Sequence, residues 1–427
     1  MTSYRKSPKV TKNKPSPLSN HVSEQRLWTL LMDVAVYGAT EKGGVNRQAL
    51  SQEDVAARIH VVRWAAERGF ESFQDHIGNL FVRREGTEAN LDPVMTGSHL
   101  DSQPTGGRFD GAYGVLAGLE VLHALNDANI QTRRPIEVVA WTNEEGSRFS
   151  PGAMGSSIFA GVRDLGAILD VTDPSGIILK DALEETLTAV PVPRRKPDSV
   201  TPYCYVETHI EQGPILEERK APIGVVSGIQ GIRRLNMTVM GEEAHAGTTP
   251  RRSRKDAFAS TVAIISALEN LTADDDDILR FTVGRCEVLP GSPNTVPGQV
   301  HFTIDLRHPD NDVLHAVGDK IHTVAKAIGA PCLIEVSDIS FVASTKFDKN
   351  IMDVIGDAAS RLEYDQIIMP SGAGHDAMHM SNICRTGMIF IPCLRGVSHN
   401  EAESATPGDL AAGTRVLADT IVHFANE

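Results

Sequence analysis

Two short stretches of the sequence carry side chains with the chemistry of metal ligands. A glycine-rich loop separates His99 from Asp110, and Glu144 and Glu145 lie side by side. A catalytic zinc-type site uses a few histidine and carboxylate ligands of this kind. The two stretches therefore indicate a site for divalent metal ions, and two such ions acting together can hydrolyse an amide-like bond.

Two further histidines, His209 and His399, complete the candidate set. Two metal ions about 3.5–4 Å apart need only five side chains when one carboxylate bridges them. We expect Asp110 to be the bridge, with His99 and His209 on one ion. Glu145 and His399 would then hold the other ion.

Glu144, which directly precedes the expected ligand Glu145, is not needed to bind metal. Glu144 points to the other side of the backbone from Glu145, so it is free to act as a general base. Taken singly, each candidate is more simply a structural histidine or a surface charge. The metal hypothesis depends on their joint pattern, because several of them come just after a predicted core strand.

The expected secondary structure would bring these residues together. Apolar runs predict strands over residues 92–98, 136–141 and 203–206, each ending shortly before a candidate ligand. A further strand is expected over residues 73–83. A helix is expected over residues 111–125, directly after Asp110. Open α/β sheets bind their ligands at the carboxyl ends of the strands. We therefore expect the candidates to meet on one side of a sheet.

Composition limits the class of protein. The 427 residues exceed one ordinary domain, and 41% hydrophobic content suits a soluble protein with a large core. The net charge of −14 argues against a nucleic-acid-binding surface. The five cysteines are scattered and odd in number, which predicts a reduced chain in the cytoplasm without a disulfide framework. No apolar run is long enough to cross a membrane.

A module of a different pattern interrupts the α/β segments. Its expected order is strand, helix, strand, strand, helix, strand, which gives an antiparallel sheet with two helices on one face, a ferredoxin-like layout. The organisation that we expect has four parts: a disordered tail over residues 1–20, a first catalytic part over 21–227, the inserted module over 228–339, and a second catalytic part over 340–427.

The motifs together identify a family resemblance that runs from about Val22 to the C-terminus. The chain resembles the metal-dependent aminoacylase/carboxypeptidase superfamily, and within it the amidase branch of N-carbamoyl-L-amino-acid hydrolases, β-ureidopropionases and allantoate amidohydrolases. The motifs that carry it are GSHLDS (97–102), GRFDG (107–111), NEEGSRF (143–149), HIEQGP (209–214), GEEAHAG (241–247), NTVP (294–297), DLR (305–307) and SGAGHD (371–376). The resemblance implies a di-metal aminopeptidase-like α/β catalytic domain whose inserted ferredoxin-like module is a lid and dimerisation domain.

The resemblance also assigns roles around the metal ions. It implies the same ligands, His99, Asp110, Glu145, His209 and His399, and the same general base, Glu144. It implies that Asp101 orients the ring of His99. It further suggests a cis peptide bond between Asp110 and Gly111, which would cost about 3 kcal/mol as strain held at a functional site.

For the substrate, the resemblance implies a second set of residues. Arg307 would grip the substrate carboxylate, because a guanidinium matches that shape with two hydrogen bonds. His245 would donate to the oxyanion of the tetrahedral intermediate. His245 and Asn294 would reach the site from the partner subunit of an obligatory homodimer. The remaining pocket residues implied are Gln212, Asn294, Gly372, Gly374 and His375.

The resulting hypothesis is hydrolysis of the carbamoyl C–N bond of a small anionic N-carbamoyl amino acid to amino acid, ammonia and carbon dioxide. The nearest alternative is an allantoate amidohydrolase, which needs the same metal site and the same carboxylate grip. A more remote alternative is a non-catalytic binding protein with the same fold. Two divalent ions are expected per subunit; zinc and manganese suit these ligands, and cobalt and nickel also fit. No nucleic acid and no membrane is expected as a partner.

Overall fold

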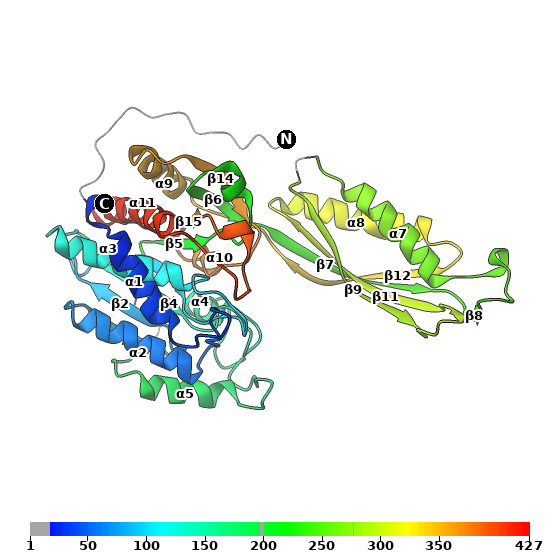
Figure 1. The fold of residues 1–427 in the computed structure, drawn as a ribbon, viewed down its shortest axis with the longest axis horizontal. Coiled ribbons are helices and arrows are strands. Elements are labelled where there is room, and N and C mark those ends of the chain that lie inside the picture. Colours follow the sequence, from blue (N-terminus) through cyan, green and yellow to red (C-terminus); the bar gives the residue numbers. More distant parts are fainter. Residues whose placement is uncertain (1–17, 197–199, 276) are drawn as a thin grey trace. The chain divides into compact units, whose positions relative to one another are not determined.

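The computed structural model describes residues 18–196, 200–275 and 277–427, which form two compact units (Figure 1). The small unit is Gly228–Lys346, and the large unit contains the described residues up to Ser227 together with Phe347–Glu427. The first and last residues of the small unit lie side by side, because Thr345 and Lys346 pair with Ile229 and Gly228.

The large unit is built on one mixed sheet. Its central strands β4, β3, β5 and β15 run parallel to their neighbours, whereas β2 and β6 flank them in antiparallel pairing. β1 continues the sheet beyond β2, and β14 pairs with β6. The bounds are β1 Glu71–Gln74, β2 Leu80–Arg84, β3 Val94–His99, β4 Ile136–Trp141, β5 Cys204–Ile210, β6 Ile223–Ile229, β14 Gln366–Ser371 and β15 Arg385–Ile391. β13 Thr345–Lys346, at the end of the small unit, pairs with the last residues of β6.

The carboxyl ends of the four central strands are level with one another. His99 is the last residue of β3 and pairs with Trp141, the last residue of β4. His209, near the end of β5, pairs with Phe390 of β15. Because the strands are fully buried on both faces over β3, β4 and β5, their register is fixed by the core. The side chains just beyond these ends are therefore delivered to one edge of the sheet.

Helices cover the sheet of the large unit. α1, α2, α3, α9 and α11 share one apolar core with the sheet, while α4 and α10 pack on each other and on the strands β4, β5 and β15. Side-chain caps start four of these helices, with Ser23, Ser51, Asp348 and Thr406 each accepting from an amide in the first turn. The bounds are η1 Ser19–His21, α1 Glu24–Ala35, α2 Gln52–Ala66, α3 Ala112–Asp127, α4 Met154–Phe159, α5 Leu179–Ala189, α6 Ile215–Arg219, α9 Lys349–Arg361, α10 Ala377–Met380, η3 Leu394–Gly396 and α11 Pro407–Ala425.

The small unit is a four-stranded antiparallel sheet with two helices. The strand order β12-β7-β11-β9, with α7 after β7 and α8 after β11, is the ferredoxin-like arrangement. Alternate side chains of β7 and β11 are fully buried against the helices, as the period of a half-buried strand requires. A separate ribbon of two short strands joins β8 to β10. The bounds are β7 Gly231–Met240, β8 Ala244–His245, η2 Arg251–Ser253, α7 Ala257–Thr272, β9 Arg280–Leu289, β10 Thr295–Val296, β11 Gln299–His308, α8 Asn311–Ile328 and β12 Leu333–Val342.

The mixed α/β class predicted from the sequence is confirmed, and several local expectations are corrected. The single strand that the apolar pattern suggests over residues 73–83 is a hairpin, because Asp75 accepts hydrogen bonds from the amides of Ile77 and Asn79 and makes a turn there. Most of the expected tail, residues 1–17, lies outside the described residues. Leu18 is already fully buried, so the folded part begins before residue 21. Within the described part of the chain, no helix has the length and hydropathy to span a membrane.

Candidate metal centre

All five predicted metal ligands converge at one edge of the sheet in the large unit. Two groups of metal-ligating atoms form there, each with its members within 4.8 Å of one another. One group is His99, Asp110 and His209, and the other is Asp110, Glu145 and His399. Asp110 belongs to both groups, as expected of a carboxylate that bridges two cations.

The two oxygens of Asp110 face different groups. Oδ1 lies 3.2 Å from Nε2 of His209 and 3.8 Å from Nε2 of His99. Oδ2 lies 3.5 Å from Nε2 of His399, and that nitrogen lies 3.3 Å from Oε2 of Glu145. One carboxylate thus presents one oxygen to each candidate site.

The turn that aims Asp110 is made at Gly111. This glycine has φ 66° and ψ −50°, and the Ala112 amide donates to the Asp110 carbonyl at 2.7 Å, which is a γ-turn. A Cβ atom on Gly111 would lie 2.2 Å from the His99 ring, so only glycine fits. The expected cis bond between Asp110 and Gly111 is wrong, because the chain reverses through this γ-turn instead; cis bonds in the described residues precede Pro151, Pro290 and Pro331.

Backbone carbonyls fix the orientation of two candidate histidines. Nδ1 of His99 lies 2.9 Å from the Asp101 carbonyl, and Nδ1 of His209 lies 2.9 Å from the Ile210 carbonyl. A carbonyl oxygen only accepts, so each Nδ1 carries a proton and each Nε2 is the nitrogen that faces the candidate site. The Gly111 amide lies 3.2 Å from Nε2 of His209. Partners of this kind orient metal-ligating imidazoles.

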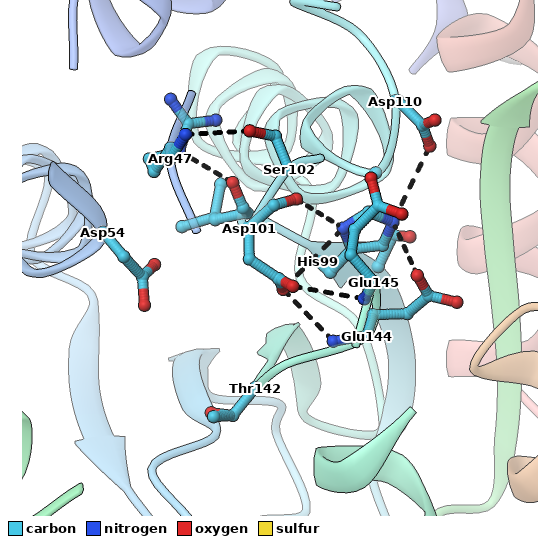
Figure 2. Close-up of polar contacts among 12 residues, drawn as sticks. Arg47, Asp54, His99, Asp101, Ser102, Asp110, Thr142, Glu144 and Glu145 are labelled. Carbon is cyan, nitrogen blue, oxygen red and sulfur yellow. Dashed lines mark hydrogen bonds and ion pairs between the residues drawn. The ribbon is translucent and has the colours of Figure 1, made fainter. Parts of the chain in front are cut away.

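Asp101 holds the segment that carries the two glutamates (Figure 2). Its fully buried carboxylate accepts from the Glu144 amide at 3.2 Å and from the Glu145 amide at 3.1 Å. The sequence suggests that Asp101 orients His99, and it does contact that ring, but through its backbone carbonyl; the carboxylate oxygen is 3.9 Å from Nδ1. Burial and the charge of Asp54 raise the pKa of Asp101 to about 7.

Glu144 lies against the first candidate site. Its Oε2 is 3.4 Å from Nε2 of His99, and Figure 2 shows its side chain directed toward that ring. Burial raises the pKa of Glu144 well above its usual range, and the charges of Asp376 and Glu145 add to the effect. A carboxyl group in this state can take up and hold a proton beside the candidate metal centre.

Several residues that the sequence did not single out support the ligands. The backbone amide and the side-chain amide of Gln103 donate to the two oxygens of Glu145 at 3.1 and 2.8 Å. The buried guanidinium of Arg47 donates to the Leu100 carbonyl at 2.7 Å and so fixes the chain just beyond His99. These contacts depend on tertiary structure, and no spacing in the sequence signals them.

The predicted pocket residues of the large unit are divided between two loops. Gln212 donates to Oδ2 of Asp110 at 3.0 Å, and its own Oε1 is buried without a hydrogen-bond partner among the described residues. His375 is buried with its ring 4.5 Å from that of His209, centroid to centroid. Gly372 and Gly374 lie in the same loop as His375, and a Cβ atom at either would meet open space.

A third group of ligand-type atoms lies behind the first. It consists of Glu207, His209 and His375. His209 already uses Nδ1 for the Ile210 carbonyl, and its Nε2 faces Asp110. We therefore do not count this group as a separate metal site.

The three other predicted residues belong to the small unit. His245 lies on the exposed ribbon, where it pairs with Thr295, and Asn294 directly precedes that strand. Arg307 lies on β11, where its Nε donates to Asp305 at 2.8 Å. The first two residues are at one end of the unit, and Arg307 is toward the other end of the sheet.

The charges of the candidate site suit divalent cations. Burial, together with the charges of Asp110 and Asp101, raises the pKa of Glu145 to about 9. Burial would also raise the pKa of Asp110, but its hydrogen bond and charge interaction with His209 outweigh that and hold the pKa far below its usual range. Buried carboxylates crowded in this way need positive charge. Histidine nitrogens and carboxylate oxygens suit zinc, manganese, cobalt or nickel, so the residues present fit such ions.

Known proteins share this fold and sequence over nearly the whole chain. The sequence matches peptidase family M20/M25/M40 over residues 95–423. An N-carbamoyl-L-amino-acid amidohydrolase of Rhizobium meliloti is 38% identical over 413 residues, which cover 95% of this chain and 98% of that protein. Allantoate deiminase 2 of Glycine max is 32% identical over 425 residues, which cover 90% of this chain and 88% of that protein. The crystal structure of an amidase of the hydantoinase/carbamoylase family from Burkholderia multivorans has a TM-score of 0.89 at 44% identity, covering 95% of this chain and 98% of that one.

The buried ionisable groups predict how stability responds to pH when metal is removed. In the folded chain the pKa is about 7 for Asp101 and about 9 for Glu145 and His209; for His209, burial opposes the increase and the Asp110 hydrogen bond outweighs it. In the unfolded chain the values are about 4 for the carboxyl groups and about 6.5 for histidine. Between about pH 6.5 and about pH 9 these groups bind more protons in the folded state, so the free energy of unfolding falls as pH rises.

The measurement is the thermal unfolding midpoint by circular dichroism, with a chelator or with added Zn²⁺. With the chelator, the midpoint should fall from about pH 6.5 to about pH 9. Zn²⁺ should raise the midpoint, and by more at the higher pH, because the cation replaces protons on these groups. A Zn²⁺ effect that shrinks as pH rises would contradict this electrostatic description.

Proposed function

Because the chain belongs to peptidase family M20/M25/M40, we propose that it is a metal-dependent amidohydrolase that cleaves the carbamoyl C–N bond of N-carbamoyl amino acids. The products would be the amino acid and carbamic acid, and the carbamic acid then breaks down to ammonia and carbon dioxide. The observation that carries the proposal is the arrangement of two ligand groups around one shared carboxylate, Asp110, with Glu144 beside them. The near full-length similarity to N-carbamoyl-L-amino-acid amidohydrolases supports the choice of substrate.

In this proposal His99 and His209 hold one divalent ion, Glu145 and His399 hold the other, and Asp110 binds both. Zinc or manganese is the expected metal, and cobalt or nickel would also fit the donor set. When bound, the ions would polarise the substrate carbonyl and lower the pKa of water.

Glu144 would move the protons of the reaction. It takes a proton from the attacking water and returns it to the nitrogen that leaves the carbamoyl carbon, so the carboxyl group ends the cycle as it began. Its raised pKa supports both steps, since the group must accept a proton readily and hold it until the C–N bond breaks. Its attachment to the Asp101 carboxylate through its own backbone amide keeps it in place during transfer.

The substrate would be gripped at its carboxylate and at its carbamoyl group. We assign the carboxylate to Arg307 and the developing oxyanion to His245, with Asn294 donating a further hydrogen bond. In the large unit, Oε1 of Gln212, which has no hydrogen-bond partner among the described residues, would accept from a substrate N–H. Gly372, Gly374 and His375 would line the pocket beside it, where the missing glycine side chains leave room.

The small unit supports a homodimer as the active form. Arg307 pairs with Ile232, whereas Gln299, at the other end of β11, pairs with Met240 just before the His245 ribbon. The eight steps along β11 from Gln299 to Arg307 span about 27 Å. One copy of the small unit therefore holds Arg307 and His245 too far apart to serve one small substrate. Exposed apolar side chains on this unit, Phe258, Val262, Leu333 and Ile339, support dimerisation through it.

The proposal places the enzyme in the cytoplasm, with a small anionic substrate as its partner. All five cysteines are free, which suits a reducing compartment. The net charge of −14 does not suit nucleic acid, and it makes a local cation such as Arg307 necessary for an anionic substrate.

The first test replaces the proposed base. Glu144→Gln should retain both metal ions and lose turnover by roughly 100- to 10,000-fold, because it keeps the shape of the side chain and removes the proton acceptor. Turnover is measured on several N-carbamoyl-L-amino acids, N-carbamoyl-β-alanine and allantoate, after loading with Mn²⁺ or Zn²⁺.

The wild-type enzyme in the same panel decides between the alternatives. Turnover of N-carbamoyl amino acids supports the proposal, preference for allantoate would replace it with an allantoate amidohydrolase, and binding without turnover would indicate a non-catalytic protein. A Glu144→Gln variant as active as the wild type would remove Glu144 from its role.

The second test asks whether His245 acts on the partner's site. A heterodimer purified through two tags pairs a Glu144→Gln chain with a His245→Ala chain. One of its two sites then combines an intact Glu144 with an intact His245 from the other chain, so turnover should be about half that of the wild type.

The reciprocal heterodimer is the control. It pairs a wild-type chain with a chain that carries both substitutions, and it should be nearly inactive because its only intact Glu144 meets His245→Ala. The opposite result, an active reciprocal pair and an inactive first pair, would show that His245 serves its own chain.

A further inference from the structure

The loop that carries His399 has little regular structure to hold it. Between the end of β15 at Ile391 and the start of α11 at Pro407, its only helical segment is the short η3. His399 has φ 52°, and its side chain is 51% exposed. A histidine on such a loop is a poor metal ligand unless other contacts fix the loop.

A buried glutamate supplies those contacts. Glu403 is 5% exposed, and its Oε1 accepts hydrogen bonds from the amides of Phe109 and Asp110, both at 3.0 Å. Its Oε2 lies 3.0 Å from the hydroxyl of Ser398, the residue before His399. The Glu403 carboxylate therefore joins the segment that carries Asp110 to the loop that carries His399.

Ser398 extends this connection to the shared carboxylate. Its hydroxyl lies 2.8 Å from Oδ2 of Asp110, the oxygen that faces His399 and Glu145, and it receives a 3.3 Å hydrogen bond from Gln212. The hydroxyl has one proton to donate, to Asp110 or to Glu403. In both cases, Ser398, Glu403 and Gln212 form one hydrogen-bonded network next to the candidate site of Asp110, Glu145 and His399.

The chain leaves space for this glutamate at Gly107. A Cβ atom at Gly107 would lie 2.1 Å from both Cδ and Oε1 of Glu403, so the carboxylate packs directly against the glycine backbone. The segment that leads to Asp110 thus wraps around the Glu403 side chain. This packing and the hydrogen bonds come from different atoms, and both place Glu403 at the junction of the two loops.

We propose that Glu403 is a positioning residue for the cation site of Asp110, Glu145 and His399. This inference rests on the proposed function, because it assigns a role at the same metal centre. His99 and His209 lie on core strands with carbonyl partners of their own, so their site depends less on Glu403.

The test counts bound metal rather than turnover. Wild-type and variant proteins are titrated with Mn²⁺, and free Mn²⁺ is measured by electron paramagnetic resonance. The wild type should bind two ions. Glu403→Ala should keep one and bind the second roughly 10- to 100-fold more weakly, the size of effect expected when a partner behind a metal ligand is lost.

A conservative variant separates positioning from bulk. In Glu403→Gln the amide oxygen can still accept from the two backbone amides, and the amide nitrogen can donate to Ser398. This variant should therefore recover most of the affinity for the second ion. A Gln variant as weak as the Ala variant would contradict a role based on these hydrogen bonds.

Glu120→Ala is the matched control for loss of a buried carboxylate. Glu120 is fully buried on α3, and its hydrogen-bond partners, the Ser23 amide at 2.7 Å and the Arg26 guanidinium, are not candidate ligands. The control should lose thermal stability and still bind two ions. Equal weakening of the second ion in Glu120→Ala would show that destabilisation alone explains the Glu403 effect, and would overturn the proposal.

Gly107→Ala provides an independent route if Glu403→Ala does not fold. The added methyl group displaces the carboxylate without removing it, so weaker binding of the second ion is again expected. A folded Glu403→Ala or Gly107→Ala protein that binds both ions with wild-type affinity would overturn the inference. A wild-type protein that binds fewer than two ions would instead contradict the proposed function.

Discussion

The site depends on one carboxylate that presents its two oxygens to two different sets of ligands. Oδ1 of Asp110 faces His99 and His209, and Oδ2 faces His399 near Glu145. This geometry requires the γ-turn at Gly111 and the level ends of β3 and β5. The fold of the large unit can therefore be understood as the support for the position of Asp110.

Bringing acidic groups together in the core is costly. Removing a single ion from water costs several kcal/mol even after the protein relaxes, so the buried carboxylates must be compensated. Asp101 receives two backbone amides, Glu145 receives two donors from Gln103, and Glu403 receives two backbone amides. These hydrogen bonds compensate only part of the negative charge, and two divalent cations would neutralise the rest.

The sequence predicted the parts of the site that follow from local pattern. Apolar runs located strands β3 and β4, and the candidates His99 and Glu145 follow from their ends. The helix after Asp110 was predicted because its apolar residues recur at helical spacing. Where the pattern was ambiguous, as in the hairpin of β1 and β2, the prediction was wrong because a side-chain hydrogen bond at Asp75 decides the turn.

The residues that support the ligands could not be found in this way. Gln103, Ser398 and Glu403 act through contacts between segments that are far apart in the sequence, and their own neighbours carry no periodic signal. The cis bond expected after Asp110 failed for a similar reason, since the backbone had a second way to reverse direction at a glycine.

Crystals grown with Zn²⁺ or Mn²⁺, with diffraction recorded at the absorption edge of the metal, test the central claim most directly. Two anomalous peaks about 3.5–4 Å apart are predicted, one beside each oxygen of Asp110. A single peak, or two peaks that do not share Asp110, would contradict the account.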